Sequence, residues 1–210
     1  TFWHSMGGVN GEAIDTLVKK FNDENEYGIT VDAQYQGEYD DSLNKLKSAQ
    51  IGNMGADLVQ VYEIGTRFMI ESGWTVPMQE MIDADNYDVS QIEPNLAAYY
   101  TIDDKLYSMP FNSSTPIMYY NKDMFAKAGI TDIPDSLEGI DKIGEQLMSK
   151  GGASEVMSLG IYGWFFEQFV GKQGLDYANN GNGRDKAATA VDFDKNGAAK
   201  NILTEWQKLN

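Results

Sequence analysis

The chain has 210 residues, of which 42% are apolar and 12% are aromatic, so it carries enough apolar side chains for a folded core and is not disordered, collagen-like or coiled-coil. Its 32 acidic residues outnumber its 16 basic residues, and the net charge of −16 argues against nucleic acid or an anionic membrane surface as a partner. The absence of cysteine excludes disulfides, thiolate metal sites and a cysteine nucleophile, and no apolar run is long enough for a membrane span.

The first 62 residues repeat a strand followed by a helix. A short apolar run around Phe2 ends at a glycine pair, and apolar side chains over residues 14–21 then recur at helical spacing. Residues 29–35 alternate apolar and polar side chains as a half-exposed strand does, residues 57–62 predict a third strand, and a thin apolar stripe between them predicts a helix. Strands that alternate with helices in this way predict βαβ units and a mostly parallel sheet.

The pattern is less regular beyond residue 63. The predicted elements are helices near 66–72 and 78–82, a hairpin over 100–110 that turns at Asp103-Asp104, a strand at 117–120 and a helix at 124–128. A second run of strand and helix begins after residues 111–116, so we expect a domain boundary there.

The last third of the chain predicts helices joined by polar loops. Asp135 is expected to cap a helix, with Glu138 three positions on as its capping partner. A polar loop is predicted at 179–184, and a final helix is predicted from about residue 197 to 209.

One acidic motif imitates a calcium-binding loop. In residues 192–197, Asp192, Asp194 and Asn196 alternate and a glycine follows, as at the start of an EF-hand. The twelfth position is Leu203 instead of the glutamate that a calcium loop needs, so a loop that starts a helix is the preferred interpretation. We expect no metal site.

Motifs for catalysis are weak or missing. His4 is the single histidine, so it must serve in any Ser-His-Asp triad, yet the chain has no Gly-x-Ser-x-Gly sequence. One histidine cannot supply the sites typical of transition-metal enzymes. No phosphate-binding loop follows a strand, and Arg67 and Arg184 are the only arginines available to bind an anion. A hydrolase that uses Ser113 or Ser114 with His4 stays open as a weak alternative.

Polar and aromatic side chains follow the predicted strands, where ligands bind in open α/β sheets. They are His4 and Ser5 after the first strand, Glu38 and Tyr39 after the second and Glu63 after the third, with Ser113, Ser114 and Trp164 later in the chain. Carboxylate, hydroxyl and indole groups together suit a hydroxyl-rich ligand. The alternative is that the aromatics are core or rim residues and that Glu63 is a favourable charge at a helix start.

Several of these segments resemble the extracellular solute-binding proteins of ABC importers, most of all the glycerol-3-phosphate-binding branch of that family. The resemblance runs in order from Thr1 to about Asn210 and rests on residues 2–6, 37–39, 60–66, 110–116 and 119–123. The Tyr-Tyr-Asn-Lys-Asp motif at 119–123, with residues 125–129, is shared by the wider sugar-binding group. The Trp-His-Ser, Val-Tyr-Glu and Phe-Asn-Ser-Ser-Thr-Pro pieces are more particular to glycerol-phosphate binders.

The resemblance implies an α/β fold of the two-lobed periplasmic-binding-protein type (class II-like). Residues 1–112 are expected to form the N-terminal part of the first lobe, and residues 113–210 the hinge crossing and a partial second lobe. Family members are considerably longer than 210 residues, and their later part supplies further contacts, including an arginine for the phosphate. The chain is therefore expected to be incomplete on its C-terminal side.

The resemblance also implies which residues bind the ligand. Tyr39, Glu63 and Ser114 would contact it from or beside the first lobe, and Trp164 from the second. The family has a paired tryptophan pattern there, whereas this chain has Ile161 at the other position. His4 and Ser5 would line the same cleft by proximity.

The expected function is capture of glycerol-3-phosphate or a glycerophosphodiester for delivery to the membrane subunits of an ABC permease. A neutral mono- or oligosaccharide is the alternative ligand, favoured by the negative charge and the scarce arginine. We expect no enzymatic activity, no cofactor, a monomer, and an extracytoplasmic location, either periplasmic or lipid-anchored at the cell surface. No basic and apolar leader precedes Thr1 in this sequence.

Overall fold

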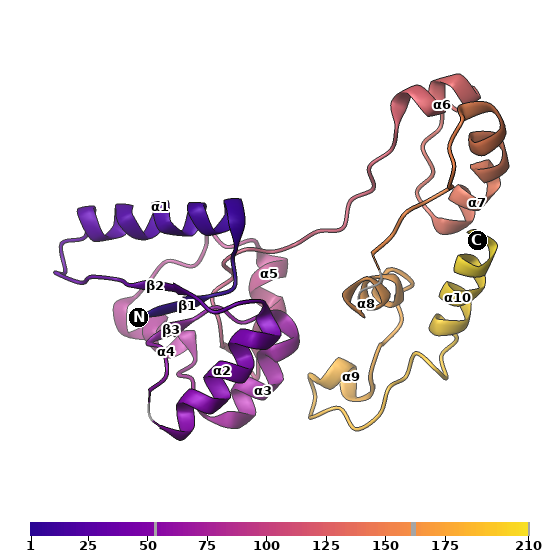
Figure 1. Ribbon diagram of the computed structural model, residues 1–210. Helices are drawn as coiled ribbons and strands as arrows, with labels where there is room; N and C mark the ends of the chain where they lie inside the picture. Colours follow the sequence, from indigo (N-terminus) through magenta and orange to yellow (C-terminus); the bar gives the residue numbers. More distant parts are fainter. Residues whose placement is uncertain (53, 161–162, 210) are drawn as a thin grey trace. The chain divides into compact units, whose positions relative to one another are not determined.

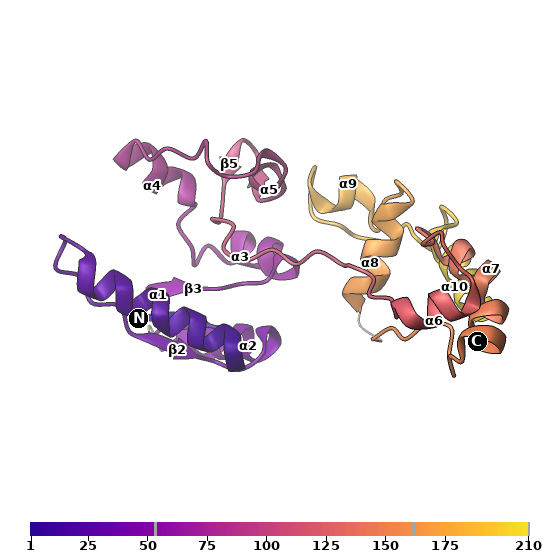
Figure 2. The same cartoon turned by 90° about the horizontal axis from the view of Figure 1, so that it is seen from above.

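The structure, a computed structural model, describes residues 1–52, 54–160 and 163–209. The chain divides into two compact units, Thr1–Phe111 and Asn112–Asn210 (Figures 1 and 2). Within the described ranges, no helix combines the length and apolar character needed to cross a membrane.

The first unit is built on a small parallel sheet. Its elements are β1 (Phe2–His4), α1 (Gly8–Glu24), β2 (Ala33–Tyr35), α2 (Tyr39–Ile51), β3 (Leu58–Val59), the 3-10 turn η1 (Glu63–Gly65) and α3 (Thr66–Ser72). The strand order is β2-β1-β3, and β1 pairs in parallel with both neighbours. The crossover through α1 runs from β1 to β2, and the crossover through α2 runs in the opposite direction, from β2 past β1 to β3. Since both are right-handed, α1 and α2 cover opposite sides of the sheet (Figure 1).

The rest of the first unit packs helices against a hairpin. It contains α4 (Met78–Asp85), α5 (Pro94–Tyr99), β4 (Thr101–Ile102) and β5 (Lys105–Leu106). The predicted hairpin is confirmed: β4 and β5 pair antiparallel, and Asp103 and Asp104 both have positive φ (50° and 60°), as a two-residue turn of the type I′ kind requires. The buried apolar residues of this unit are Phe2, Ile14, Leu46, Met69, Ile82 and Leu106.

The second unit is mainly helical. It contains α6 (Lys122–Ala128), α7 (Leu137–Gln146), the π-helical turn η2 (Leu147–Gly151), α8 (Gly163–Lys172), α9 (Asn179–Gly183) and α10 (Ala198–Leu209). One core cluster joins α6 to η2 through Phe125, Ala128 and Leu147. A second joins α8 to α10 through Val170, Ala198 and Ile202, with the rings of Phe166, Tyr177 and Phe193 packed against it. Burial raises the pKa of Tyr177, and the charge of Glu167 adds to the effect.

Four sequence predictions are wrong in detail, and one of them is the third strand, which spans Leu58–Val59 instead of the predicted 57–62. Residues 117–120 form no strand, and residues 111–121 have no helix or strand and are exposed throughout. A strand needs a partner, and no described segment pairs with this one. The N-cap of α7 is Ser136, whose Oγ accepts a hydrogen bond from Gly139 N at 3.2 Å, and not Asp135. The second strand is shorter than the predicted 29–35 and starts at Ala33.

The predicted polar loop at 179–184 is a left-handed turn. Asn180, Gly181 and Asn182 have φ values of 59°, 60° and 56°, a region that glycine and asparagine tolerate. Asn179 Oδ1 accepts hydrogen bonds from the amides of Thr189 and Ala190, which closes the loop.

Candidate functional site

The carboxyl ends of the three parallel strands are tied together by hydrogen bonds. Gln36 N donates to His4 O at 2.9 Å on one side of β1, and Gln60 N donates to Trp3 O at 2.8 Å on the other. The Gln60 side chain adds a further bond, because its Oε1 accepts from Ser5 N at 2.9 Å. The segments that leave β1, β2 and β3 are therefore held side by side at one edge of the sheet.

His4 and Ser5 lie at the centre of this edge and are buried. Their side chains are 3% and 5% exposed. His4 Nδ1 accepts a hydrogen bond from Met6 N at 3.4 Å, and its ring lies between those of Phe2 and Tyr35, with centroids 5.6 and 6.0 Å away. Ser5 Oγ has no hydrogen-bond partner within the described part of the chain. A direct ligand contact for His4 and Ser5 stays a prediction.

Tyr62, the residue before Glu63, contacts the start of α2, where Tyr39 lies. The ring of Tyr39, the first residue of α2, stacks on that of Tyr62 with centroids 5.1 Å apart and planes 7° apart. Tyr62 OH donates to Asp40 Oδ1 at 2.5 Å. Glu63 follows directly, opens η1 and is half-buried. The ring of Tyr39 therefore lies against Tyr62, the residue that directly precedes Glu63.

The helices that start at this edge have no side-chain caps. The N-cap residues of α1, α2 and η1 are Gly7, Glu38 and Tyr62, and none of them accepts a side-chain cap hydrogen bond. The first amides of a helix have no partner within the helix and carry its positive dipole end. The edge thus offers backbone amides as hydrogen-bond donors and the Glu63 carboxylate as an acceptor. Hydroxyl groups of a polyol can bond to both, because each hydroxyl donates and accepts.

Ser114 and Trp164 lie in the second unit. Ser114 is exposed in the segment 111–121, and Trp164 is half-buried near the start of α8, with its ring 5.5 Å from that of Phe165. Ile161 lies outside the described residues. Ligand contact by Ser114 and Trp164 stays a prediction.

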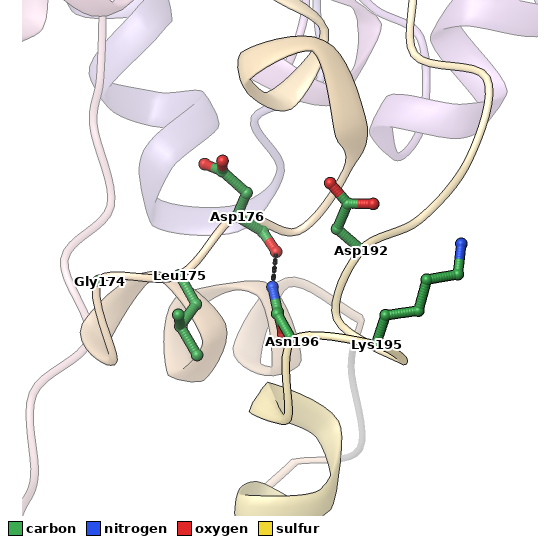
Figure 3. A pocket seen from close by; sticks show the side chains of 6 residues that line it. All are labelled: Gly174, Leu175, Asp176, Asp192, Lys195 and Asn196. Atoms are coloured by element: carbon green, nitrogen blue, oxygen red, sulfur yellow. Dashed lines mark hydrogen bonds between the residues drawn. The ribbon is translucent and has the colours of Figure 1, made fainter.

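Among the described residues, shallow hollows are present in both units. In the first unit, a hollow of about 440 Å³ lies at the start of α2 and is lined by Gln36, Gly37, Asp41, Asn44, Lys45 and Ser48. In the second, a hollow of about 370 Å³ is lined by Gly174, Leu175, Asp176, Asp192, Lys195 and Asn196 (Figure 3). Neither includes a residue predicted to bind the ligand.

The hollow in the second unit contains part of the calcium-like motif. Asn196 Nδ2 donates to Asp176 O at 2.7 Å (Figure 3), and its Oδ1 accepts from Ala198 N at 3.0 Å, the first residue of α10. Asn196 therefore stabilises the start of α10, which confirms the interpretation as a helix-start loop. Over residues 1–52, 54–160 and 163–209, no group of three or more His, Cys, Asp or Glu side chains is placed to hold a metal ion.

Sequence reasoning missed the residues that organise the edge. Gln36, Asp40, Gln60 and Tyr62 make the contacts described above, and none of them had been given a role. Gln36 directly follows the predicted second strand, a position that could have marked it, whereas Gln60 lies inside the predicted third strand and follows β3 only because that strand ends at Val59. The partners of Tyr62 are far away in sequence, and no local pattern indicates them.

Comparison with known proteins identifies the family. The family model described as bacterial extracellular solute-binding protein matches residues 16–209. The sn-glycerol-3-phosphate-binding periplasmic protein UgpB of Salmonella paratyphi A is 38% identical over 99% of this chain and 49% of its own length. The UgpB protein of Escherichia coli K12 is 36% identical with the same coverage. The chain thus spans about half the length of these relatives.

Solved structures share the fold. The cyclic alpha-maltosyl-1,6-maltose binding protein from Arthrobacter globiformis matches 99% of this chain and 53% of its own with a TM-score of 0.69 at 21% identity. An ABC substrate-binding protein from Listeria monocytogenes in complex with cycloalternan matches 98% of this chain and 50% of its own with a TM-score of 0.70 at 19% identity. The chain belongs to the bacterial extracellular solute-binding protein family.

Proposed function

We propose that this chain is part of the solute-binding component of an ABC importer, which captures glycerol-3-phosphate or a glycerophosphodiester outside the cytoplasm and delivers it to membrane permease subunits. The observation that carries the proposal is the 38% identity over 99% of this chain to a protein named for glycerol-3-phosphate binding. The chain spans 49% of that relative, so the proposal concerns the whole protein.

The first unit would bind the alcohol end of the ligand. Glu63 would accept hydrogen bonds from glycerol hydroxyls, and Tyr39 would fix their orientation. A carboxylate next to a phosphate dianion would be repulsive, so Glu63 is assigned to the hydroxyls and not to the phosphate. His4 and Ser5, which are buried at the same edge, would line the cleft by proximity.

The second unit would contribute Ser114 as a hydrogen-bonding group and Trp164 as an apolar surface for the carbon chain. Binding in this family type is reversible, and no covalent bond is made or broken. Ligand contacts that form only in a closed state shift the equilibrium toward that state by their differential affinity. A closed, loaded form is then what the permease would recognise.

The proposal also assigns the protein a binding role and no catalysis. The relatives are named as binding proteins, and His4, the residue a hydrolase would need, is buried and accepts a hydrogen bond from Met6 N. Hydrolysis of a glycerophosphodiester that disappears in His4→Ala would contradict this assignment.

Replacement of Glu63 by glutamine in the full-length protein tests the site. Hydrogen bonds to a charged group contribute about 1.5–3 kcal/mol, so Glu63→Gln should raise the Kd for glycerol-3-phosphate roughly 10- to 150-fold by calorimetry. Glu80→Gln removes the same charge from an exposed position on α4 and should leave the Kd unchanged. An unchanged Kd in Glu63→Gln would remove Glu63 from the site.

A neutral mono- or oligosaccharide is the second candidate ligand, because the net charge of −16 disfavours an anion. Titration of the wild-type protein with maltose-type sugars and with glycerol-3-phosphate separates the two. Tight sugar binding without a response to glycerol-3-phosphate would reverse their order.

A further inference from the structure

Tyr62 connects two of the residues assigned to the ligand: it directly precedes Glu63, and its side chain contacts the first turn of α2, which begins with Tyr39. Its ring stacks on that of Tyr39 at 5.1 Å and 7°, and its hydroxyl donates to Asp40 Oδ1 at 2.5 Å. A tyrosine hydroxyl has one hydrogen to donate, and that hydrogen is directed to Asp40. The Tyr62 hydroxyl therefore donates its hydrogen to α2 and not to a ligand.

The backbone of Tyr62 fixes the position of Glu63. Tyr62 is the N-cap of η1, and its carbonyl accepts from Gly65 N at 2.9 Å. A Cβ on Gly65 would lie 2.6 Å from Val61 Cγ1 and 3.6 Å from the Tyr62 ring. Gly65 thus leaves room for the tight turn that follows Tyr62, and the direction of Glu63 depends on where Tyr62 is held.

The contact with Asp40 suits the start of a helix. Asp40 lies in the first turn of α2, where the helix dipole stabilises a carboxylate. A hydroxyl that donates to a carboxylate forms a strong, short hydrogen bond. Ring and hydroxyl act on successive residues of α2, so together they restrict both the distance between α2 and η1 and their rotation.

We propose that Tyr62 is a positioning residue, which holds Tyr39 and Glu63 at the spacing that the ligand requires without itself being a primary ligand contact. The proposal rests on the proposed function and adds to it a residue that determines affinity. It follows from the stacked ring, the hydroxyl bond to Asp40 and the tight turn into Glu63.

A double-mutant cycle in the full-length protein tests this role, with calorimetric titration of glycerol-3-phosphate or, if only a sugar binds, of that sugar. Tyr62→Phe keeps the ring and removes the hydroxyl, and it should raise the Kd roughly three- to tenfold. Tyr62→Leu also removes the stacked ring and should raise it further. Tyr87→Phe, an exposed tyrosine of the same unit, is the control and should leave the Kd unchanged.

The change in Kd in double variants distinguishes a positioning role of Tyr62 from a general effect on the stability of the fold. In the Glu63→Gln background, Tyr62→Phe should raise the Kd by a smaller factor than it does in the wild-type protein, because one of the two groups that Tyr62 positions is already altered. Asp40→Asn should raise the Kd by about the same factor as Tyr62→Phe. The double variant Asp40→Asn/Tyr62→Phe should bind no more weakly than either of these single variants. If Tyr62 had a purely structural role, the fold-change in Kd of each double variant would instead equal the product of the fold-changes of its single variants.

The outcomes distinguish this inference from the proposed function. If the wild-type protein binds a ligand and Tyr62→Phe and Tyr62→Leu bind it with the same Kd, the positioning role is wrong and the function stands. Multiplicative effects with Glu63→Gln also overturn the positioning role. If the wild-type protein binds neither glycerol-3-phosphate nor a sugar, the proposed function fails and the role of Tyr62 fails with it.

Discussion

In the first unit, three parallel strands bring His4, Tyr39 and Glu63 to one edge, whereas in the second unit Ser114 lies in an exposed segment without a helix or strand. Side-chain bonds from Gln60 and Tyr62 reinforce the edge in the first unit. The first unit therefore positions its candidate residues through its own sheet and hydrogen bonds, whereas no helix or strand positions Ser114.

The two units also differ at their helix starts. None of the five α-helices described in the first unit has a side-chain cap, whereas in the second unit Asn121 caps α6 and Ser136 caps α7. A cap satisfies amides that would otherwise face solvent or a ligand. At the sheet edge, the starts of α1 and α2 therefore lack the side-chain hydrogen bonds that stabilise the starts of α6 and α7 in the second unit.

Substitutions in the apolar cores of the two units should lower the free energy of unfolding more than any other change considered below. Leu46 of α2 is 2% exposed, and Leu46→Ala should cost about 2–5 kcal/mol of unfolding free energy. Hydrogen exchange measured by mass spectrometry should rise in peptides from residues 1–111 and stay unchanged in those from 112–209. Ile202→Ala in α10, where Ile202 is 3% exposed, should give the reverse pattern.

Exposed leucines serve as controls for this experiment. Leu17 of α1 and Leu203 of α10 are each 55% exposed, and their replacement by alanine should cost less than about 0.5 kcal/mol. Exchange that rises equally in both units after either core change would show that the units do not unfold separately.

The capping difference predicts a medium effect. Ser136→Ala removes the hydrogen bond to Gly139 N and should cost about 1 kcal/mol in chemical denaturation. Glu38→Ala at the start of α2 removes no cap bond and should change stability by less than about 0.5 kcal/mol. Ser136→Thr should restore most of the loss. Equal losses at Ser136 and Glu38 would contradict the comparison.

The smallest effect is expected from a surface ion pair of the second unit. The hydrogen bond from Lys142 and its charge lower the pKa of Glu138 below its ordinary value of 4.5, and Glu138 raises that of Lys142 above 10.5. The stabilisation by the lowered Glu138 pKa is present above pH 4.5 and is lost as the pH falls through the folded value. The stabilisation by Lys142 is present below pH 10.5 and is lost as the pH rises through the folded value.

An NMR titration of the Glu138 carboxyl carbon checks this pair. In Lys142→Met, the pKa of Glu138 should return toward 4.5, with little change in overall stability because the pair is exposed. Lys150→Met, another lysine of the same unit, should leave the Glu138 pKa unchanged. A Glu138 pKa that does not respond to Lys142→Met would rule out the interaction.

Elements that depend on neighbouring residues could be predicted from the amino-acid sequence alone. The helix predicted near 66–72 corresponds to α3, and Asp103-Asp104 marked the hairpin correctly, because helical periodicity and two-residue turns are local properties. The choice of Asp135 over Ser136 as a cap was wrong because both residue types cap helices, and local chemistry does not distinguish adjacent candidates.

Which polar residues contact one another depends on how the chain folds and could not be predicted from local sequence patterns. Gln60 bonds to Ser5 across 55 positions and Tyr62 bonds to Asp40 across 22, and such partners are chosen by the order of strands in the sheet. The predicted strand at 117–120 was wrong for the same reason, because its apolar pattern is local and a strand forms only beside a partner. The residue types at the candidate site can therefore be recognised in the sequence, whereas their positions relative to one another depend on strand pairing between segments far apart in the chain.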